Sequence, residues 1–147
     1  MRIIGLALIS ALAASPTALT DCAGEPTDDE LTVSNPQWDD SNGDGVWSRG
    51  ETLRVTIDIT NTSGEDNLNY PGVMLVTDYG SVNIEPPEYS FYGIFAGDTY
   101  QAYFSVTAPL NAPSGQPVTL TAWGTELHCN GSSCPSTNEI DLDLTIQ

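Results

Sequence analysis

Between residues 31 and 146, apolar side chains recur at every second position, in short runs separated by turn-forming residues. The clearest run, residues 52–60, has Leu53, Val55, Ile57 and Ile59 on one face. Period-two alternation indicates a strand that turns one face to a core and the other to water. No stretch after residue 30 has the apolar spacing of a helix, so this part of the chain is expected to be all-β.

The alternating runs predict about seven strands in about 115 residues, a spacing that is typical of an antiparallel sandwich. The expected strands are 31–33, 52–60, 73–76, 82–84, 100–106, 118–122 and 140–146. Asn35-Pro36 should end the first of them. The first and last strands are expected at sheet edges, where Asp141 and Asp143 would face outward and discourage edge-to-edge pairing.

Residues 40–51, D-S-N-G-D-G-V-W-S-R-G-E, match the twelve-position calcium loop. The expected ligands are the side chains of Asp40, Asn42, Asp44 and Glu51, the Val46 carbonyl, and Ser48 through a water. In an EF-hand such a loop joins two helices, but here it leads directly into a strand. The sequence therefore predicts a structural Ca²⁺ site at the edge of a β-domain. A plain Asx/Gly turn on an acidic surface is the alternative.

The chain is strongly acidic, with 20 Asp and Glu against three Lys and Arg and a formal net charge of −17. Such a field repels nucleic acid and anionic lipid head groups, and it attracts divalent cations. We therefore expect no nucleic-acid partner.

Residues 1–21 are typical of an export signal, with Arg2 at the start, an apolar run over 3–14 and Pro16 after it. The run is too short to span a bilayer as a helix. Leu19-Thr20-Asp21-Cys22 resembles a lipobox, which would lipidate Cys22, although Asp21 departs from the usual small residue. Cleavage near Ala18 or Thr20 is the alternative. The acidic residues 22–30 are expected to be a tether.

The three cysteines are Cys22, Cys129 and Cys134. Cys129 and Cys134 flank the flexible turn 130–133, so in an oxidising compartment they are expected to form a disulfide. This leaves Cys22 for a lipid, a free thiol or an intermolecular bond. His128 is the only histidine and there is no second Cys pair, so no zinc site is expected. A Cys–His nucleophile pair is not expected, because the disulfide would occupy Cys129.

Residues 40–52 with 53–64, 94–106 and 112–120 resemble bacterial extracellular Ig-like domains of the cell-adhesion-related (CARDB-like) type. The resemblance implies a single Ig-like β-sandwich over residues 31–147. Such domains usually serve as accessory modules in surface proteins and secreted peptidases. We therefore expect a non-enzymatic module, exported to the envelope or outside the cell, that contacts a surface or envelope protein. Its only membrane attachment would be a lipid at Cys22.

Two other functions remain open. A carbohydrate-binding module would use exposed aromatic rings, with Trp123 and Trp38 as candidates. Strand parity turns Trp123 and Tyr103 outward but assigns them to different sheets, so they would not share one platform. An inhibitor of a secreted protease would use the loop 129–134 as a stiff finger.

The N-terminus provides the first test. If Cys22 carries the anchor, mass spectrometry of the mature protein should find a diacyl- or triacyl-modified Cys22 at its start. An unmodified terminus at residue 19, 21 or 22 would instead indicate a freely secreted domain.

Overall fold

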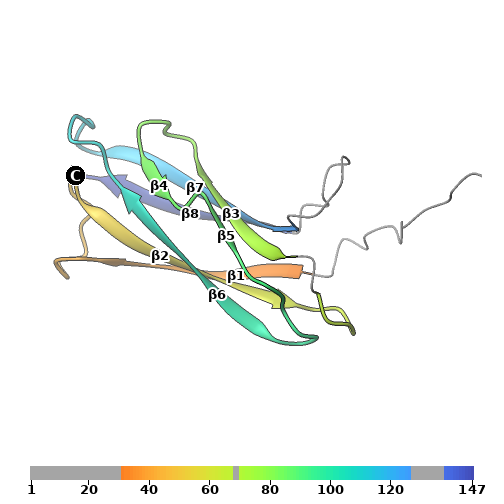
Figure 1. Cartoon of the computed structure of the whole chain (residues 1–147). Coiled ribbons are helices and arrows are strands. Elements are labelled where there is room, and N and C mark those ends of the chain that lie inside the picture. The colour runs from red at the N-terminus through yellow and green to blue at the C-terminus, as the bar shows by residue number, and fades with distance from the viewer. Residues whose placement is uncertain (1–30, 68–69, 127–137) are drawn as a thin grey trace, which may run out of the picture.

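The computed structural model describes residues 31–67, 70–126 and 138–147. Its strands are β1 (Leu31–Asp40), β2 (Thr52–Asn61), β3 (Pro71–Thr77), β4 (Asn83–Glu85), β5 (Glu88–Ser90), β6 (Thr99–Thr107), β7 (Gln116–Glu126) and β8 (Glu139–Ile146). They form two antiparallel sheets, β1-β2-β6-β4 and β5-β3-β7-β8, which face each other (Figure 1). The expected all-β sandwich is confirmed. The expected signal segment 1–21 and tether 22–30 lie outside the described residues.

The core lies between the sheets and is built from the alternating residues that the sequence indicated. On β2 all four apolar residues of the predicted face are buried. Further buried side chains come from β6, which pairs with β2 in the same sheet, and from β3 and β7 in the facing sheet. They include Ala102, Phe104 and Val106 from β6, Val73 and Leu75 from β3, and Val118, Leu120 and Ala122 from β7. No helix long and apolar enough to cross a membrane occurs in the parts of the chain that the structure describes.

The first strand is longer than predicted, because Asn35-Pro36 forms a bulge rather than an end. Ser34 pairs with Asp58 and Gln37 with Thr56, so two residues of β1 stand opposite one residue of β2. Asn35 has a positive φ of 52°, and its side-chain amide donates to Asp58 Oδ2 at 2.9 Å. An edge strand tolerates a proline at such a bulge, since no ladder hydrogen bond is lost.

The described chain has eight strands, one more than the seven expected, because residues 88–90 form the short strand β5. β4 pairs with β6 in one sheet and β5 pairs with β3 in the other, so the chain changes sheets between them. β5 has a single large apolar side chain, Tyr89, between Glu88 and Ser90, so no repeat was there for the sequence to reveal. Tyr89 of β5 lies edge-on to Phe104 of β6, with 6.3 Å between the ring centroids, and so links the two sheets.

The terminal strands lie at sheet edges, as expected, and side-chain hydrogen bonds hold both of them. Asp141 and Asp143 are exposed on β8 and accept hydrogen bonds from the hydroxyls of Thr121 and Thr119. On β1, the Asn138 side chain accepts from the Val33 N–H at 2.9 Å and donates to the Val33 carbonyl at 2.8 Å. This amide occupies backbone groups that an open edge would offer to another strand.

Two leucines provide a matched test of the core. Leu53 is 0% exposed and Leu110 is 82% exposed. Leu53→Ala should lower the free energy of unfolding by about 2–5 kcal/mol, because it leaves a cavity between the sheets. Leu110→Ala should change it by less than about 0.5 kcal/mol. Urea unfolding measures both, and equal effects of the two substitutions would contradict the fold.

Candidate functional site

The loop of residues 41–51 connects β1 to β2, and the bulge in β1 decides how it begins. After the bulge, Trp38 pairs with Val55 and Asp40 with Leu53, so both side chains share the inner face with buried β2 residues. Asp40 is only 8% exposed. Its two carboxylate oxygens accept hydrogen bonds from the N–H groups of Gly43 and Gly45, each at 2.5 Å. The loop is therefore folded around the carboxylate of its first residue.

The next side chains continue this arrangement. Asn42 Oδ1 accepts from the Asp44 N–H and Asp44 Oδ1 accepts from the Val46 N–H, both at 2.8 Å. These are Asx turns, in which a side chain takes the place of a backbone acceptor. Gly45 has a φ of 74°, a conformation that side chains with a Cβ rarely adopt. The side-chain oxygens of Asp40, Asn42 and Asp44 thus hold the first half of the loop in a series of tight turns.

The second half of the loop attaches to both sheets. Trp47 is buried, forms a parallel bridge with Ile146 of β8, and accepts the Gln147 N–H at 2.9 Å. Its indole N–H donates to the Glu51 carbonyl at 3.1 Å. That carbonyl also accepts from the Ala108 N–H, just after β6. The loop therefore connects β8, at the edge of one sheet, to the segment that follows β6 in the other sheet.

The Glu51 side chain is held in the loop by only one of its two oxygens. Oε2 accepts the Ser48 N–H at 2.8 Å, whereas Oε1 is buried and has no hydrogen-bond partner. A buried carboxylate oxygen without a partner costs free energy of about 1–3 kcal/mol or more. A cation is the partner that such an oxygen lacks, and an all-oxygen donor set is what Ca²⁺ requires. The residue types of the loop are therefore those that calcium sites use.

The six predicted calcium ligands lie in one stretch, residues 40–51, but their carboxylate groups do not converge on one point. Within residues 31–67, 70–126 and 138–147, no group of three or more His, Cys, Asp and Glu side chains is placed to hold a metal. The reason is that Asp40, Asp44 and Glu51 each accept backbone N–H groups of the loop itself. Val46 and Ser48 follow in the same loop, and the six-residue calcium site remains a prediction.

The aromatic residues considered for sugar binding do not form one platform. Trp123 lies on the outer face of β7 and Tyr103 on the outer face of β6, in different sheets, as strand parity predicted. Trp38 is half-buried and packs against the core. It also lines a groove of about 240 Å³ beside the loop, together with Val46 and Leu144. Cys22, His128, Cys129 and Cys134 lie outside the described residues, so the disulfide and the lipid anchor stay predictions.

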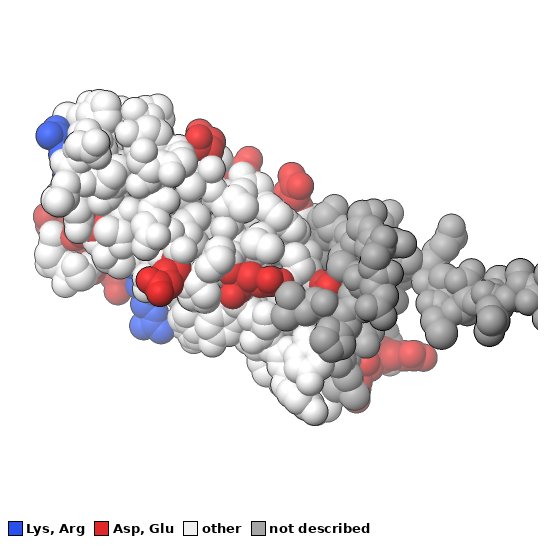
Figure 2. Space-filling model, turned by 45° about the horizontal axis from the view of Figure 1, so that its top comes forward, with Lys and Arg blue, Asp and Glu red and all other residues white. Residues whose placement is uncertain are grey.

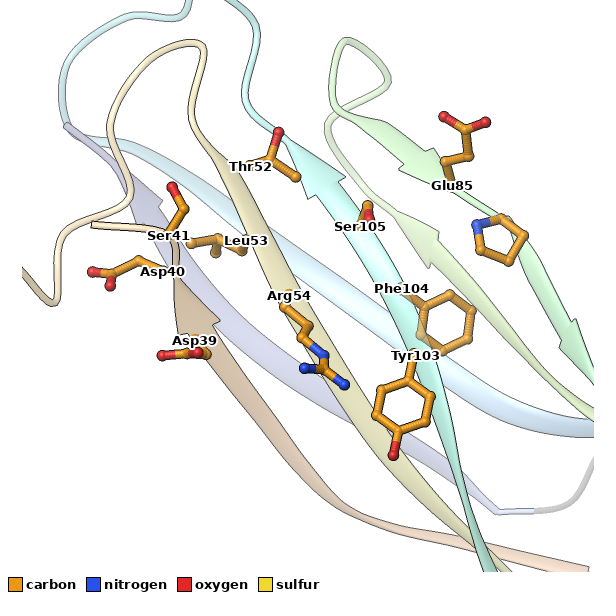
Figure 3. Close-up of a pocket in the computed structure, with 11 residues that line it drawn as sticks. Asp39, Asp40, Ser41, Thr52, Leu53, Arg54, Glu85, Tyr103, Phe104 and Ser105 are labelled. Atoms are coloured by element: carbon orange, nitrogen blue, oxygen red, sulfur yellow. The ribbon is translucent and has the colours of Figure 1, made fainter. Parts of the chain in front are cut away.

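Sequence reasoning missed a second groove, of about 470 Å³, on the outer side of the first sheet (Figure 3). Asp39, Arg54, Glu85 and Tyr103 are among the residues that line it. The Arg54 guanidinium lies 4.7 Å from the centre of the Tyr103 ring, a cation–π contact. Only the pairing of β2 with β6 brings these two residues together, so no local pattern could have revealed the contact.

Comparisons with solved structures agree with this architecture. No family model and no curated protein matches the sequence. Native alpha-2-macroglobulin from Escherichia coli, solved from domain MG7 to the C-terminus, is 16% identical with a TM-score of 0.55, over 82% of this chain and 17% of that one. A cryo-EM reconstruction of the native E. coli protein is 15% identical with a TM-score of 0.53, over 80% and 7%.

A CARDB domain from Pyrococcus furiosus is also similar, with 15% identity and a TM-score of 0.48, over 80% of this chain and 94% of that one. The chain spans only a small part of the macroglobulin chains, and identities this low show a shared fold alone. The TM-scores above 0.5 show that the chain shares its fold with a part of the macroglobulin structures. A shared fold does not define what a domain does.

The backbone of the loop can be tested with two glycines. No atom lies within 4 Å of a Cβ built on Gly45 or on Gly80, but only Gly45 has a positive φ. Gly45→Ala should therefore destabilise the protein by about 1–2 kcal/mol, through backbone strain alone. Gly80→Ala should be within about 0.5 kcal/mol of the parent. Chemical unfolding of both variants measures the difference, and a neutral Gly45→Ala would show that the loop has another conformation.

Proposed function

We propose that this chain is an exported, calcium-stabilised Ig-like module that contacts a protein partner at the cell surface or in the envelope. The observation that carries the calcium part is the unpartnered, buried Oε1 of Glu51 at the twelfth position of a calcium-loop sequence. Asp40, Asn42 and Asp44 occupy the alternate positions that supply side-chain oxygens in such loops.

The role of the ion would be structural. Bound Ca²⁺ supplies positive charge among Asp40, Asp44 and Glu51 and satisfies the Glu51 oxygen that the protein leaves unpaired. Asp44 and Glu51 each accept a backbone N–H of the loop with one carboxylate oxygen, and the ion would bind the other oxygen of each. Because Trp47 and Glu51 connect the loop to β8 and to the segment after β6, the ion would strengthen the junction of the two sheets.

The absence of catalysis and the location are parts of the same proposal. The only histidine, His128, stands beside Cys129, which is expected to be in a disulfide. Export rests on the sequence of residues 1–21, and a lipid at Cys22 would be the only attachment to a membrane. An acidic domain suits such a place, because like charge keeps it away from anionic head groups.

Calcium should raise the melting temperature of the purified protein after it has been stripped of metal. At a free calcium concentration a hundredfold above the dissociation constant, binding to the native state adds about 2.7 kcal/mol, or about 10 °C for a domain of this size. Glu51→Gln should remove most of this response, since it deletes the charge at the closing ligand. Differential scanning calorimetry with and without a chelator measures both.

The matched control is Glu139→Gln, which deletes one exposed charge at the start of β8. It should leave the response to calcium unchanged, because it lies outside the loop. A melting temperature that is indifferent to calcium and chelator would refute the calcium part of the proposal. An equal loss of response in both glutamate variants would show a general effect of net charge instead.

A further inference from the structure

Residues 91–98, which we call the aromatic loop, lie at the end of the sandwich opposite the loop of residues 41–51. They connect β5 to β6, next to the point where β2 ends. Tyr92 is 79% exposed and Phe95 is 54% exposed, and both are large apolar side chains. Two aromatic rings exposed so close together in one loop are not accounted for by packing of the core.

A buried anchor holds the middle of the aromatic loop between these rings. Ile94 is fully buried, and its backbone exchanges two hydrogen bonds with that of Asn67, at 2.8 and 2.9 Å. The Ile94 carbonyl also accepts from the side-chain amide of Asn61, at 2.9 Å. Asn61 is itself fully buried at the end of β2. The backbone between the two exposed rings is thus fixed to the body of the domain.

Both ends of the aromatic loop are held as well. The Phe91 N–H donates to the Pro71 carbonyl at 2.8 Å, and the Gly97 N–H donates to the Asn61 carbonyl at 2.9 Å. The Ala96 N–H donates to Asp66 Oδ1 at 3.0 Å. A loop with this many fixed backbone groups loses little entropy on binding, which makes it suitable for recognition.

Tyr70, the residue just before β3, supports the first of the two rings. Its ring meets Tyr92 edge to face, with centroids 5.2 Å apart and planes at 73°. Tyr70 has a positive φ of 53°, which is uncommon for a residue with a bulky side chain. Strained backbone of this kind persists where the surrounding structure requires it, often at binding sites.

The surroundings of the aromatic loop are acidic. Glu65, Asp66 and Asp98 are exposed there. The only Lys or Arg residues in the described parts of the chain are Arg49, in the loop of residues 41–51, and Arg54, near the start of β2. In Figure 2 the blue atoms lie in the left half of the view, whereas red atoms appear across the visible face. Exposed aromatic rings among exposed carboxylates attract cations, through the rings and the charges together.

We propose that the aromatic loop binds an arginine- or lysine-rich segment of a partner protein, with its cations over Tyr92 and Phe95 and beside Asp66 and Asp98. This names the chemistry of the partner and rests on the proposed function as a protein-binding module. The net charge of −17 would also steer such a segment toward the domain. A neutral glycan carries no positive charge for these carboxylates to attract, and the rings of Tyr70 and Tyr92, inclined at 73° to each other, offer no flat platform.

The test uses the full chain and a fluorescein-labelled octa-arginine peptide, with binding followed by fluorescence anisotropy at about 0.15 M salt, where long-range attraction is largely screened. The double variant Tyr92→Ala, Phe95→Ala should weaken binding about tenfold, without any change in charge. The control Val76→Ala, Leu110→Ala removes exposed apolar side chains elsewhere and should stay within twofold of the parent. Melting temperatures confirm that each variant is folded.

A second pair of variants tests the carboxylates. Asp66→Asn, Asp98→Asn should weaken peptide binding about fivefold more than Asp141→Asn, Asp143→Asn, which removes the same charge from the outer face of β8. Equal loss in both pairs, or an unchanged affinity in the aromatic variant, would overturn the proposal. So would binding of a neutral glycan panel that depends on Tyr92 and Phe95 while the peptide does not. None of these results affects the calcium response, so failure here is distinct from failure of the calcium site.

Discussion

The one-residue bulge in β1 is the constraint on which much of the domain depends. Without it, the residues that follow Asn35-Pro36 would keep the parity of Leu31 and Val33, and Trp38 and Asp40 would face water. With it, Trp38 stands opposite Val55 and Asp40 stands opposite Leu53, on the inner face. The carboxylate of Asp40 is then buried at the start of the loop, where it organises the next five residues. A single inserted residue thus connects the packing of an edge strand to the shape of a candidate ion site.

The connecting loops at the two ends of the sandwich are held in place by different interactions. At one end, Trp47 inserts an indole between the sheets, and the loop of residues 41–51 depends on oxygen atoms that turn toward its own backbone. At the other end, the buried amide of Asn61 bonds the carbonyls of Glu65 and Ile94 and so holds the connections around it. Both ends are well fixed, but only the second exposes aromatic rings. We therefore assign stability to the first end and recognition to the second.

The fold by itself does not decide among these roles, because similar sandwiches occur as parts of very different proteins. Glu51 Oε1 is buried without a partner, and the proposed calcium site rests on that oxygen. Tyr92 and Phe95 are exposed on a hydrogen-bonded loop beside carboxylates, and the proposed cationic partner rests on those side chains. The two sites lie at opposite ends, so each can be altered without touching the other.

The sequence alone determined the all-β class, the inner faces of β2, β6, β7 and β8, and the position of the calcium-loop motif, because these depend on local period and spacing. It did not determine β5, the continuation of β1 past Pro36, or the inward turn of Asp40. Those depend on pairing with β2 and β3, which lie far along the chain. Only the tertiary structure joined Trp47 to β8, placed Arg54 over Tyr103, and surrounded Ile94 with Asn61 and Asn67 so that Tyr92 and Phe95 were left in solvent. The physical reason is that burial and hydrogen bonding between distant segments are decided by strand register, which no local pattern contains.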